Sequence, residues 1–363
     1  MIAPVHRQAG PRRLPSDTVD GAQIVTAGQP YAYLAGRLAT ALLDVSDDPA
    51  VLDTQGFWAV VGTFEGAWTF ARFGQVVHAP QPVSAHPWLG VPPGSWASSL
   101  SESQYRSGVS AVRELVAAGE VYQVNLCRVM SAEVAPLLPL ASLGTRLGRG
   151  NPAPYSAQVV VPEAGVDVLS ASPELFLRRD GDVVASAPIK GTGRTAGDLT
   201  AKDVAENVMI VDLVRNDLGR VCEIGSVVVN DVLALEQHPG LVHLVSTVRG
   251  RLRSGTSWSH LLAATFPPGS VSGAPKSSAL RTIGQIEPVA RGPYCGAVGW
   301  VDADARTAAL AVGIRIFWRS GSTLHFGTGA GITWGSDPGR EWQETELKAD
   351  RLLGLAAVDR SAS

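Results

Sequence analysis

The sequence is poor in cysteine, has no surplus of basic residues and contains no long apolar run. Its three cysteines, Cys127, Cys222 and Cys295, are widely spaced and form no CxxC or Cys/His cluster. This argues against a disulfide framework and a zinc site, and fits a reducing compartment. The 30 Lys and Arg residues are outnumbered by 33 Asp and Glu residues, so nucleic acid is not expected as a partner.

Segments typical of export or membrane insertion are also missing. No run of about 18 apolar residues occurs, so no helix is expected to span a membrane. The opening stretch MIAPVHRQAGPRRLPSD is basic but lacks the apolar centre of a signal peptide. We therefore expect a cytoplasmic protein without membrane partners. Of its 363 residues, 45% are hydrophobic and 17% charged, which indicates a folded chain with a large core.

Composition divides the chain into three parts. Residues 1–22 are polar and Pro-rich and predict a loose N-terminal arm. Residues 23–100 predict a shortened β-rich part that ends in a Pro/Gly/Ser-rich connection. Residues 101–357 interleave strands and helices without the rhythm of a doubly wound sheet. We predict one α+β fold, with β-sheets packed as a sandwich, outer helices, and 23–100 joined to 101–357 in one unit.

Periodicity predicts individual elements in the third part. Apolar spacing of the helical type predicts helices over 101–118 and 200–219, the second with a near capping box of Thr200 and Asp203. Another helix is predicted to start at Ser336-Asp337-Pro338, with proline near its first turn. Runs rich in β-branched residues predict strands over 119–134, 182–189, 306–319 and 323–334, the last two paired with each other.

Two of these helices carry acids at matching intervals. Asp203 and Glu206 are spaced i,i+3, as are Glu341 and Glu344, and Lys348 follows Glu344 at i+4. Two such helices can meet around one Mg²⁺ ion, which takes one or two protein carboxylates and completes its shell with water and substrate oxygens. Two solvated helix faces are the commoner outcome of such spacing.

Three further residues have chemistry that their local sequence does not explain. Lys190 follows a Val/Ala-rich strand, and burial could make its amine a nucleophile, although a surface turn is the simpler alternative. Glu174 precedes an apolar strand and could be a general acid or a solvated edge residue. Arg315 lies inside an apolar strand and either pairs with an anion or faces outward.

The glycine run over 327–331 does not open a helix, so it is not a dinucleotide-binding loop, but its backbone could approach an anion. Together with the acids, the lysine and the arginine, it indicates an enzyme that acts on a small polycarboxylate.

Nine motifs occur together in a fixed order. They are GEVYQVNLCR (119–128), SASPELFL (170–177), APIKGT (187–192), KDVAENVMIVDLVRNDLGRVC (202–222), HLVSTVRG (243–250), FPPGSVSGAPK (266–276), RGPYCGAVGW (291–300), GTGAGI (327–332) and SDPGREWQETELKA (336–349). On these motifs the chain resembles the chorismate-utilising enzymes, and within them the component I branch of the aminodeoxychorismate synthases.

The resemblance implies a role for each candidate residue. Glu206 and Glu344 match direct Mg²⁺ ligands, and Asp203 and Glu341 match residues that hold metal-bound waters. Lys190 matches a nucleophile and Glu174 an acid/base. The residues that match chorismate contacts are Gly191, Thr192, His243, Ser270, Tyr294, Arg315, Gly329, Ala330, Gly331 and Lys348, of which Tyr294 and Arg315 would hold the enolpyruvyl carboxylate.

Two positions distinguish reactions within the resemblance. Gln123 stands where the water-adding members carry a lysine base, and a glutamine amide is no base at neutral pH. Lys190 stands where anthranilate synthases usually have alanine, whereas a PIKGT lysine is typical of aminodeoxychorismate synthases. The resemblance thus implies amination of chorismate at C4 for 4-aminobenzoate and folate synthesis. The alternatives are an anthranilate synthase component I and a non-catalytic chorismate-binding subunit.

The resemblance also implies a partner. No GxCxG-type nucleophile motif of a glutaminase is present, and all three cysteines lie within the matched motifs. We therefore expect ammonia to come from a separate glutamine amidotransferase subunit.

Overall fold

The computed structural model describes residues 18–19, 22–26, 28–135, 139–193, 195–238 and 241–358. Most of the predicted N-terminal arm, 1–22, lies outside the described residues. At its end, strand β1 (Thr18–Val19) pairs with β2 (Ala22–Val25), which in turn pairs with β7 (Val83–Ser84) in a small sheet. No helix within the described ranges is both long and apolar enough to cross a membrane.

Helices and strands alternate irregularly along the chain. The described helices are α1 (Glu102–Ala117), α2 (Leu140–Gly150), α3 (Ala201–Gly219), α4 (Trp258–Thr265), α5 (Lys276–Ile286) and α6 (Pro338–Ala356), with short 3-10 helices η1 (Pro49–Asp53), η2 (Pro162–Ala164), η3 (Ala196–Asp198) and η4 (Gly269–Val271). The strands of the large sheet are β3 (Tyr31–Leu34), β4 (Arg37–Ser46), β5 (Phe57–Gly62), β6 (Trp68–His78), β8 (Ala97–Ser98), β9 (Gln123–Glu133), β10 (Tyr155–Val161), β11 (Val166–Ser172), β12 (Leu175–Asp180), β13 (Val183–Ala187), β14 (Ile189–Gly193), β15 (Val228–His238), β16 (Leu241–Arg251), β17 (Gly273–Ala274), β18 (Ala297–Asp302), β19 (Thr307–Val312), β20 (Ile316–Ser320) and β21 (Thr323–Ile332).

Pairings between distant segments join these strands into one hydrogen-bonded sheet. β3 pairs with β10 and β5 with β18, so the strands of 23–100 share the sheet of the later region. β21 pairs along its full length with Val124–Glu133 of β9, and β14 pairs with β16. Buried aliphatic and aromatic side chains from both regions form one large core cluster. The division of the chain by composition stays a prediction.

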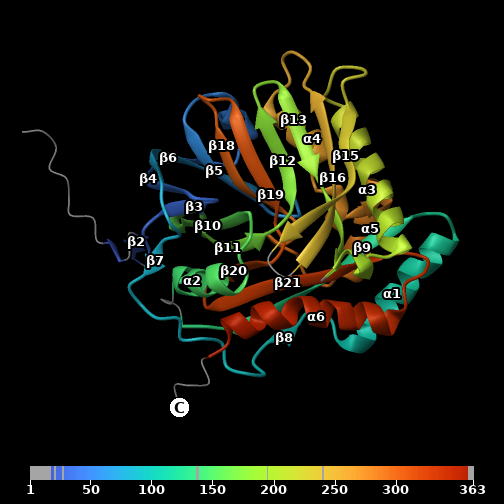
Figure 1. The fold of residues 1–363 in the computed structure, drawn as a ribbon. Coiled ribbons are helices and arrows are strands. Elements are labelled where there is room, and N and C mark those ends of the chain that lie inside the picture. Colours follow the sequence, from blue (N-terminus) through green and yellow to red (C-terminus); the bar gives the residue numbers. More distant parts are fainter. Residues whose placement is uncertain are drawn as a thin grey trace, which may run out of the picture.

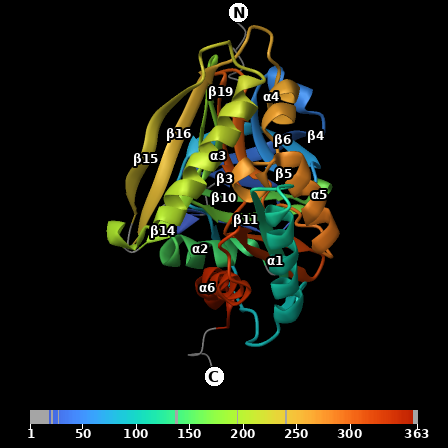
Figure 2. The ribbon, with the colours of Figure 1, turned by 90° about the vertical axis from the view of Figure 1, so that its right-hand side faces the viewer.

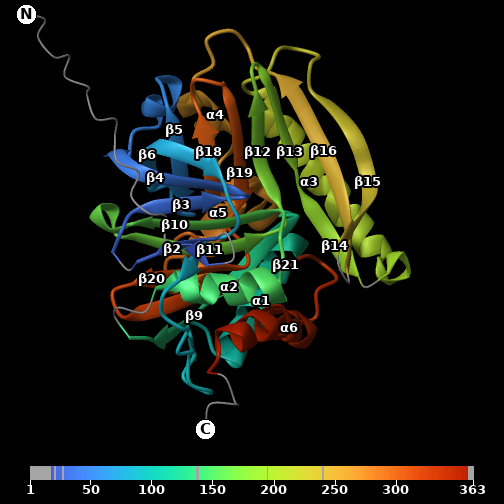
Figure 3. The same ribbon diagram turned by 60° about the vertical axis from the view of Figure 1, so that its left-hand side comes forward.

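Helices cover the sheet on its outer sides (Figure 1). α3 lies along β14 and β16, as Figure 2 shows from the side. α6 packs on β21 and contacts α1 and α2 (Figure 3). The site residues predicted on α3 and α6 therefore lie on two helices that flank the same sheet.

The three predicted helices form, and the predicted capping box at Thr200 is present. Ser101 and Gln104 make a capping box at α1, and Thr200 and Asp203 make one at α3. The Asp337 side chain accepts from two backbone N–H groups at the start of α6.

Two strand predictions need correction. The predicted strand over 306–319 is two strands, because the backbone turns at Gly313 and Arg315, the latter with φ +51°. Arg315 thus lies at the break between β19 and β20, not inside a strand. The strand predicted over 182–189 is likewise interrupted at Pro188, which has no N–H for the ladder. Lys190 consequently lies within β14 rather than after a strand.

Candidate active site

Lys190 lies at the centre of the predicted site. Its partly buried ammonium donates a hydrogen bond of 3.0 Å to the carbonyl oxygen of Ser270. Burial is the largest influence and lowers the pKa of Lys190 from its ordinary value, while Glu206 and Glu174 oppose this shift electrostatically. Glu344 also acts on Lys190. The lysine therefore lies within electrostatic range of acids from three separate segments of the chain.

Glu174 is enclosed immediately before β12. It is 4% exposed, and its Oε1 atom has no hydrogen-bond partner among the described residues. Burial raises the pKa of this carboxyl, whereas Ser270, Lys190 and Arg315 act in the opposite direction. A carboxyl in this state can hold a proton and donate it.

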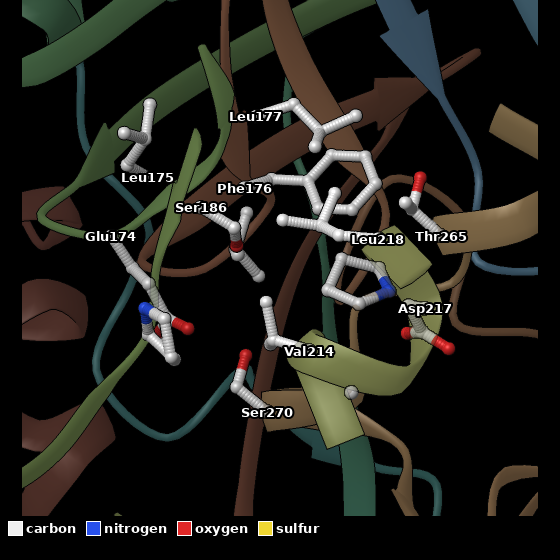
Figure 4. Close-up of a pocket in the computed structure, with 14 residues that line it drawn as sticks. Glu174, Leu175, Phe176, Leu177, Ser186, Val214, Asp217, Leu218, Thr265 and Ser270 are labelled. Atoms are coloured by element: carbon white, nitrogen blue, oxygen red, sulfur yellow. The ribbon is translucent and has the colours of Figure 1, made fainter. Parts of the chain in front are cut away.

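A cavity of about 20 Å³ adjoins Glu174. Figure 4 shows Glu174 and Ser270 lining it on one side and Asp217 on the opposite side, with Phe176 and Val214 among the apolar side chains between them. The space is large enough for about one water molecule. These apolar walls explain why burial dominates the pKa of Glu174.

The predicted acids of α3 and α6 have different surroundings. A β-carbon added at Gly331 would lie 3.7 Å from Glu206 Oε2, so Glu206 faces the glycine run. Glu344 forms a 2.6 Å ion pair with Lys348. Asp203 Oδ2 accepts hydrogen bonds from the backbone and hydroxyl of Thr200, which gives Asp203 a capping role. Glu341 is buried in the first turn of α6.

These acids form no ready-made metal cluster. Within the described ranges no group of three or more His, Cys, Asp or Glu side chains is placed to hold an ion. Glu206 and Glu344 nevertheless both act on Lys190 from opposite helices. Because Mg²⁺ requires only one or two protein carboxylates beside water and substrate oxygens, this donor set fits that ion.

The glycine run forms a surface without side chains on β21. A β-carbon at Gly329 would lie 2.5 Å from Cys127 Sγ, and one at Gly331 would overlap Gln123 Nε2. Lys348 donates to the carbonyl of Gly329 over 3.1 Å. Ala330 between them points into the opposite core cluster, so only its backbone can contribute to this surface.

The remaining predicted residues lie around this surface. The Tyr294 ring covers Gly327, where a β-carbon would overlap it, and Cys127 Sγ donates to the Tyr294 hydroxyl at 3.9 Å. Arg315 is partly buried and acts on Glu174. Thr192 is the register partner of the buried His243 across β14 and β16.

The predicted set did not include four buried polar residues. Gln123 is fully buried and neither atom of its amide group has a hydrogen-bond partner in the described part of the chain. Asn125 donates to the Val271 carbonyl over 3.1 Å. Glu287 and Arg291 form a buried ion pair. Gln123 and Asn125 could be recognised in the sequence as polar residues inside the apolar strand predicted over 119–134. No periodic pattern indicated the ion pair.

Known sequences align with most of the chain. The sequence profile of the chorismate binding enzyme family matches residues 70–354. An anthranilate synthase component 1 of Haloarcula marismortui is 39% identical over 281 residues, which cover 74% of this chain and 56% of that protein. An aminodeoxychorismate synthase component 1 of Bacillus subtilis is 34% identical over 268 residues, covering 70% and 56%. The chain thus spans a little over half the length of these curated relatives.

Solved structures show the same fold. Anthranilate synthase component I from Streptococcus pneumoniae superposes with a TM-score of 0.72 at 23% identity, covering 96% of this chain and 95% of that one. The menaquinone-specific isochorismate synthase from Escherichia coli gives 0.74 at 19% identity, covering 93% and 90%. The predicted α+β fold and the predicted resemblance are confirmed. The chain belongs to the chorismate binding enzyme family.

Proposed function

We propose that the chain is an aminodeoxychorismate synthase component I, which aminates chorismate at C4 to give 4-amino-4-deoxychorismate. The observation that carries this proposal is the position of Lys190. Its amine has a pKa lowered by burial, and it lies within electrostatic range of Glu174, a buried carboxyl whose pKa is raised. A nucleophile and an acid with pKa values shifted toward each other are the pair that covalent substitution needs.

In the proposed reaction, the neutral Lys190 amine attacks ring C2. Both conjugated ring double bonds shift, and the C4 hydroxyl leaves as water after it takes the proton of Glu174. Ammonia then attacks C4, both double bonds shift back, and the bond between C2 and the lysine nitrogen breaks. The amine ends at C4 and the lysine is regenerated. One difficult substitution is thereby split into two easier steps.

The remaining candidate residues would orient chorismate for this attack. Tyr294 and Arg315 would hold the enolpyruvyl carboxylate. The backbone of Gly191 and Thr192 on β14, and that of the run 329–331 on β21, would contact the ring from two sides. His243, Ser270 and Lys348 would complete the pocket wall.

The proposed cofactor is Mg²⁺. Glu206 and Glu344 would hold it directly, and Asp203 and Glu341 would hold its waters. When bound, Mg²⁺ supplies a Lewis acid that fixes and neutralises the ring carboxylate. The proposed ammonia source is a glutamine amidotransferase subunit, and the proposed pathway is 4-aminobenzoate and folate synthesis in the cytoplasm.

Sequence identity favours a second candidate, anthranilate synthase component I. Relatives of that name reach 38–39% identity, against 34% for the aminodeoxychorismate synthase of Bacillus subtilis. Overall identity reports mainly on the shared scaffold, however, whereas Lys190 bears on the chemistry. Direct amination at C2 has no use for a buried lysine nucleophile, so we rank this candidate second.

Two other candidates are weaker. Addition of water requires a base where this chain has Gln123, whose amide cannot accept a proton at neutral pH. A non-catalytic chorismate-binding subunit would not need Lys190 opposite Glu174.

The deciding experiment identifies the product. The purified chain is incubated with chorismate, Mg²⁺ and ammonium at mildly alkaline pH, and an aminodeoxychorismate lyase is then added. We expect 4-aminobenzoate, identified by mass and chromatography. Fluorescent anthranilate would instead establish the second candidate, and bound but unconverted chorismate would establish a non-catalytic subunit.

A further inference from the structure

The buried ion pair between Glu287 and Arg291 connects segments that carry proposed substrate contacts. The Arg291 side chain is 1% exposed, and its Nε and Nη2 atoms donate to the two oxygens of Glu287 over 2.8 and 2.6 Å. The ring of Phe64 lies 4.1 Å from the guanidinium carbon. Both partners lie just after α5, outside the set of residues that the resemblance assigns to the site.

The Glu287–Arg291 pair supplies hydrogen-bond partners to a part of β9 that has no neighbouring strand on one side. On one side of β9, β17 pairs only at Gln123 and Val124 and β8 only at Met130 and Ser131, which leaves the backbone between them without a neighbouring strand. Arg291 Nη2 donates to the Asn125 carbonyl over 2.7 Å, and Glu287 Oε1 accepts from the Cys127 N–H over 2.8 Å. Without the pair these two buried backbone groups would lose their partners.

The side-chain hydrogen bonds that Arg291 and Glu287 make to other parts of the chain all reach residues that adjoin a proposed chorismate contact. Asn125 and Cys127 are the register partners of Gly331 and Gly329 on β21. Arg291 Nη1 donates over 2.9 Å to the carbonyl of Val271, the residue after Ser270.

The pair also reaches Tyr294. Arg291 begins the turn to this residue, whose backbone N–H bonds to the Arg291 carbonyl. Arg291 thus links three segments: its guanidinium bonds to β9 beside the glycine run and to the Ser270 loop, and its backbone carbonyl bonds to the Tyr294 turn.

We propose that Arg291 and Glu287 are a positioning pair that holds these three walls of the chorismate pocket in register. The proposal rests on the proposed substrate contacts, but it does not depend on which ring carbon is aminated. A planar guanidinium is required, because a lysine ammonium cannot bind a carboxylate through two parallel bonds while donating to two separate carbonyls. Neither residue contacts the reacting atoms, so their effect is expected on chorismate binding more than on turnover.

The test compares Arg291→Lys and Glu287→Gln with a control variant, Arg319→Lys. Arg319 forms a largely buried 2.6 Å ion pair with Asp167 between β20 and β11, away from these three walls. For all variants we measure the chorismate dissociation constant with Mg²⁺ and without ammonium, together with KM, kcat and the melting temperature. Arg291→Lys and Glu287→Gln should raise the dissociation constant and KM about tenfold and lower kcat less than about threefold. Arg319→Lys should lower only the melting temperature.

The outcomes separate the two proposals. Should both site variants fold and bind chorismate within about twofold of the wild type, the positioning role is wrong even if the product is 4-aminobenzoate. An equal loss of binding in Arg319→Lys would likewise assign the effect to general destabilisation. A wild-type protein that binds no chorismate would overturn both proposals. If Arg291→Lys does not fold, Glu287→Gln decides, because its amide oxygen can still accept from Cys127.

Discussion

Lys190 on β14 donates its hydrogen bond to the carbonyl of Ser270, 80 residues later in the chain. A carbonyl partner stabilises the ammonium form, yet burial still lowers the pKa of this lysine below its ordinary value. Loss of one proton would free the amine lone pair, while a remaining N–H group can still donate to this carbonyl. The resting lysine is thus held in place until it is used.

Replacement of Lys190 tests the nucleophile directly. Lys190→Ala should lower 4-aminobenzoate formation in the lyase-coupled assay at least about 100-fold, leaving at most slow direct addition of ammonia at C2. Lys190→Arg is the matched variant, because it keeps the positive charge but cannot deprotonate. Full activity in Lys190→Arg would reduce the role of Lys190 to charge alone.

Removal of a carboxylate from α3 or α6 tests the metal site. Glu206→Gln and Glu344→Gln should each raise the Mg²⁺ concentration for half-maximal activity about tenfold or more, since a neutral amide is a weaker ligand for a hard cation. The control is Asp350→Asn on the exposed side of α6. An unchanged Mg²⁺ titration in Glu206→Gln would remove that residue from the ligand set.

Glu174 should affect stability in a pH-dependent way. Burial raises its pKa, so the folded protein binds this proton more tightly than the unfolded chain does. The stability that Glu174 contributes is therefore fully present below the unfolded pKa of about 4.3 and is lost as pH rises through the folded value. A glutamine in place of Glu174 cannot ionise, so the Glu174→Gln variant does not lose this stability as pH rises.

We expect the melting temperature of Glu174→Gln, relative to wild type, to rise by about 1–3 °C between pH 4.5 and 8. Glu163→Gln, at an exposed position in η2, is the control and should show no such trend. A difference that stays constant with pH would mean that Glu174 is not destabilised by ionisation in the folded protein.

Gly331 tests the close packing of the glycine run. In Gly331→Ala the new methyl group would overlap Gln123 Nε2 and approach Glu206, so activity should fall at least about tenfold while the fold persists. Gly335→Ala, where a β-carbon meets nothing within 4 Å, should be nearly neutral. The double variant Gly331→Ala/Gln123→Ala removes the overlap, so its melting temperature should equal that of the wild type. If it does not, Gln123 is not the obstacle.

Local sequence was sufficient for elements whose signals lie within a few residues. The Thr200–Asp203 capping box and the Asp337-Pro338 start placed α3 and α6 correctly, because capping and 3.6-residue periodicity are local effects. Arg315 shows the limit of such patterns: an apolar run of strand type continues through it, but the backbone turns there. Nothing in the run itself reveals that β19 and β20 pair with different strands.

By itself, the sequence determined the family, through nine ordered motifs, and the positions of the acids, the lysine and the glycines that could carry the chemistry. Only the tertiary structure decided that Lys190, Glu174, Glu206 and Glu344 share one electrostatic environment, and that Arg291 and Glu287 complete the open side of β9. The reason is physical. The pKa of a side chain and the partners of an unpaired strand depend on which distant segments exclude water around them, and that is a property of packing across the whole sheet.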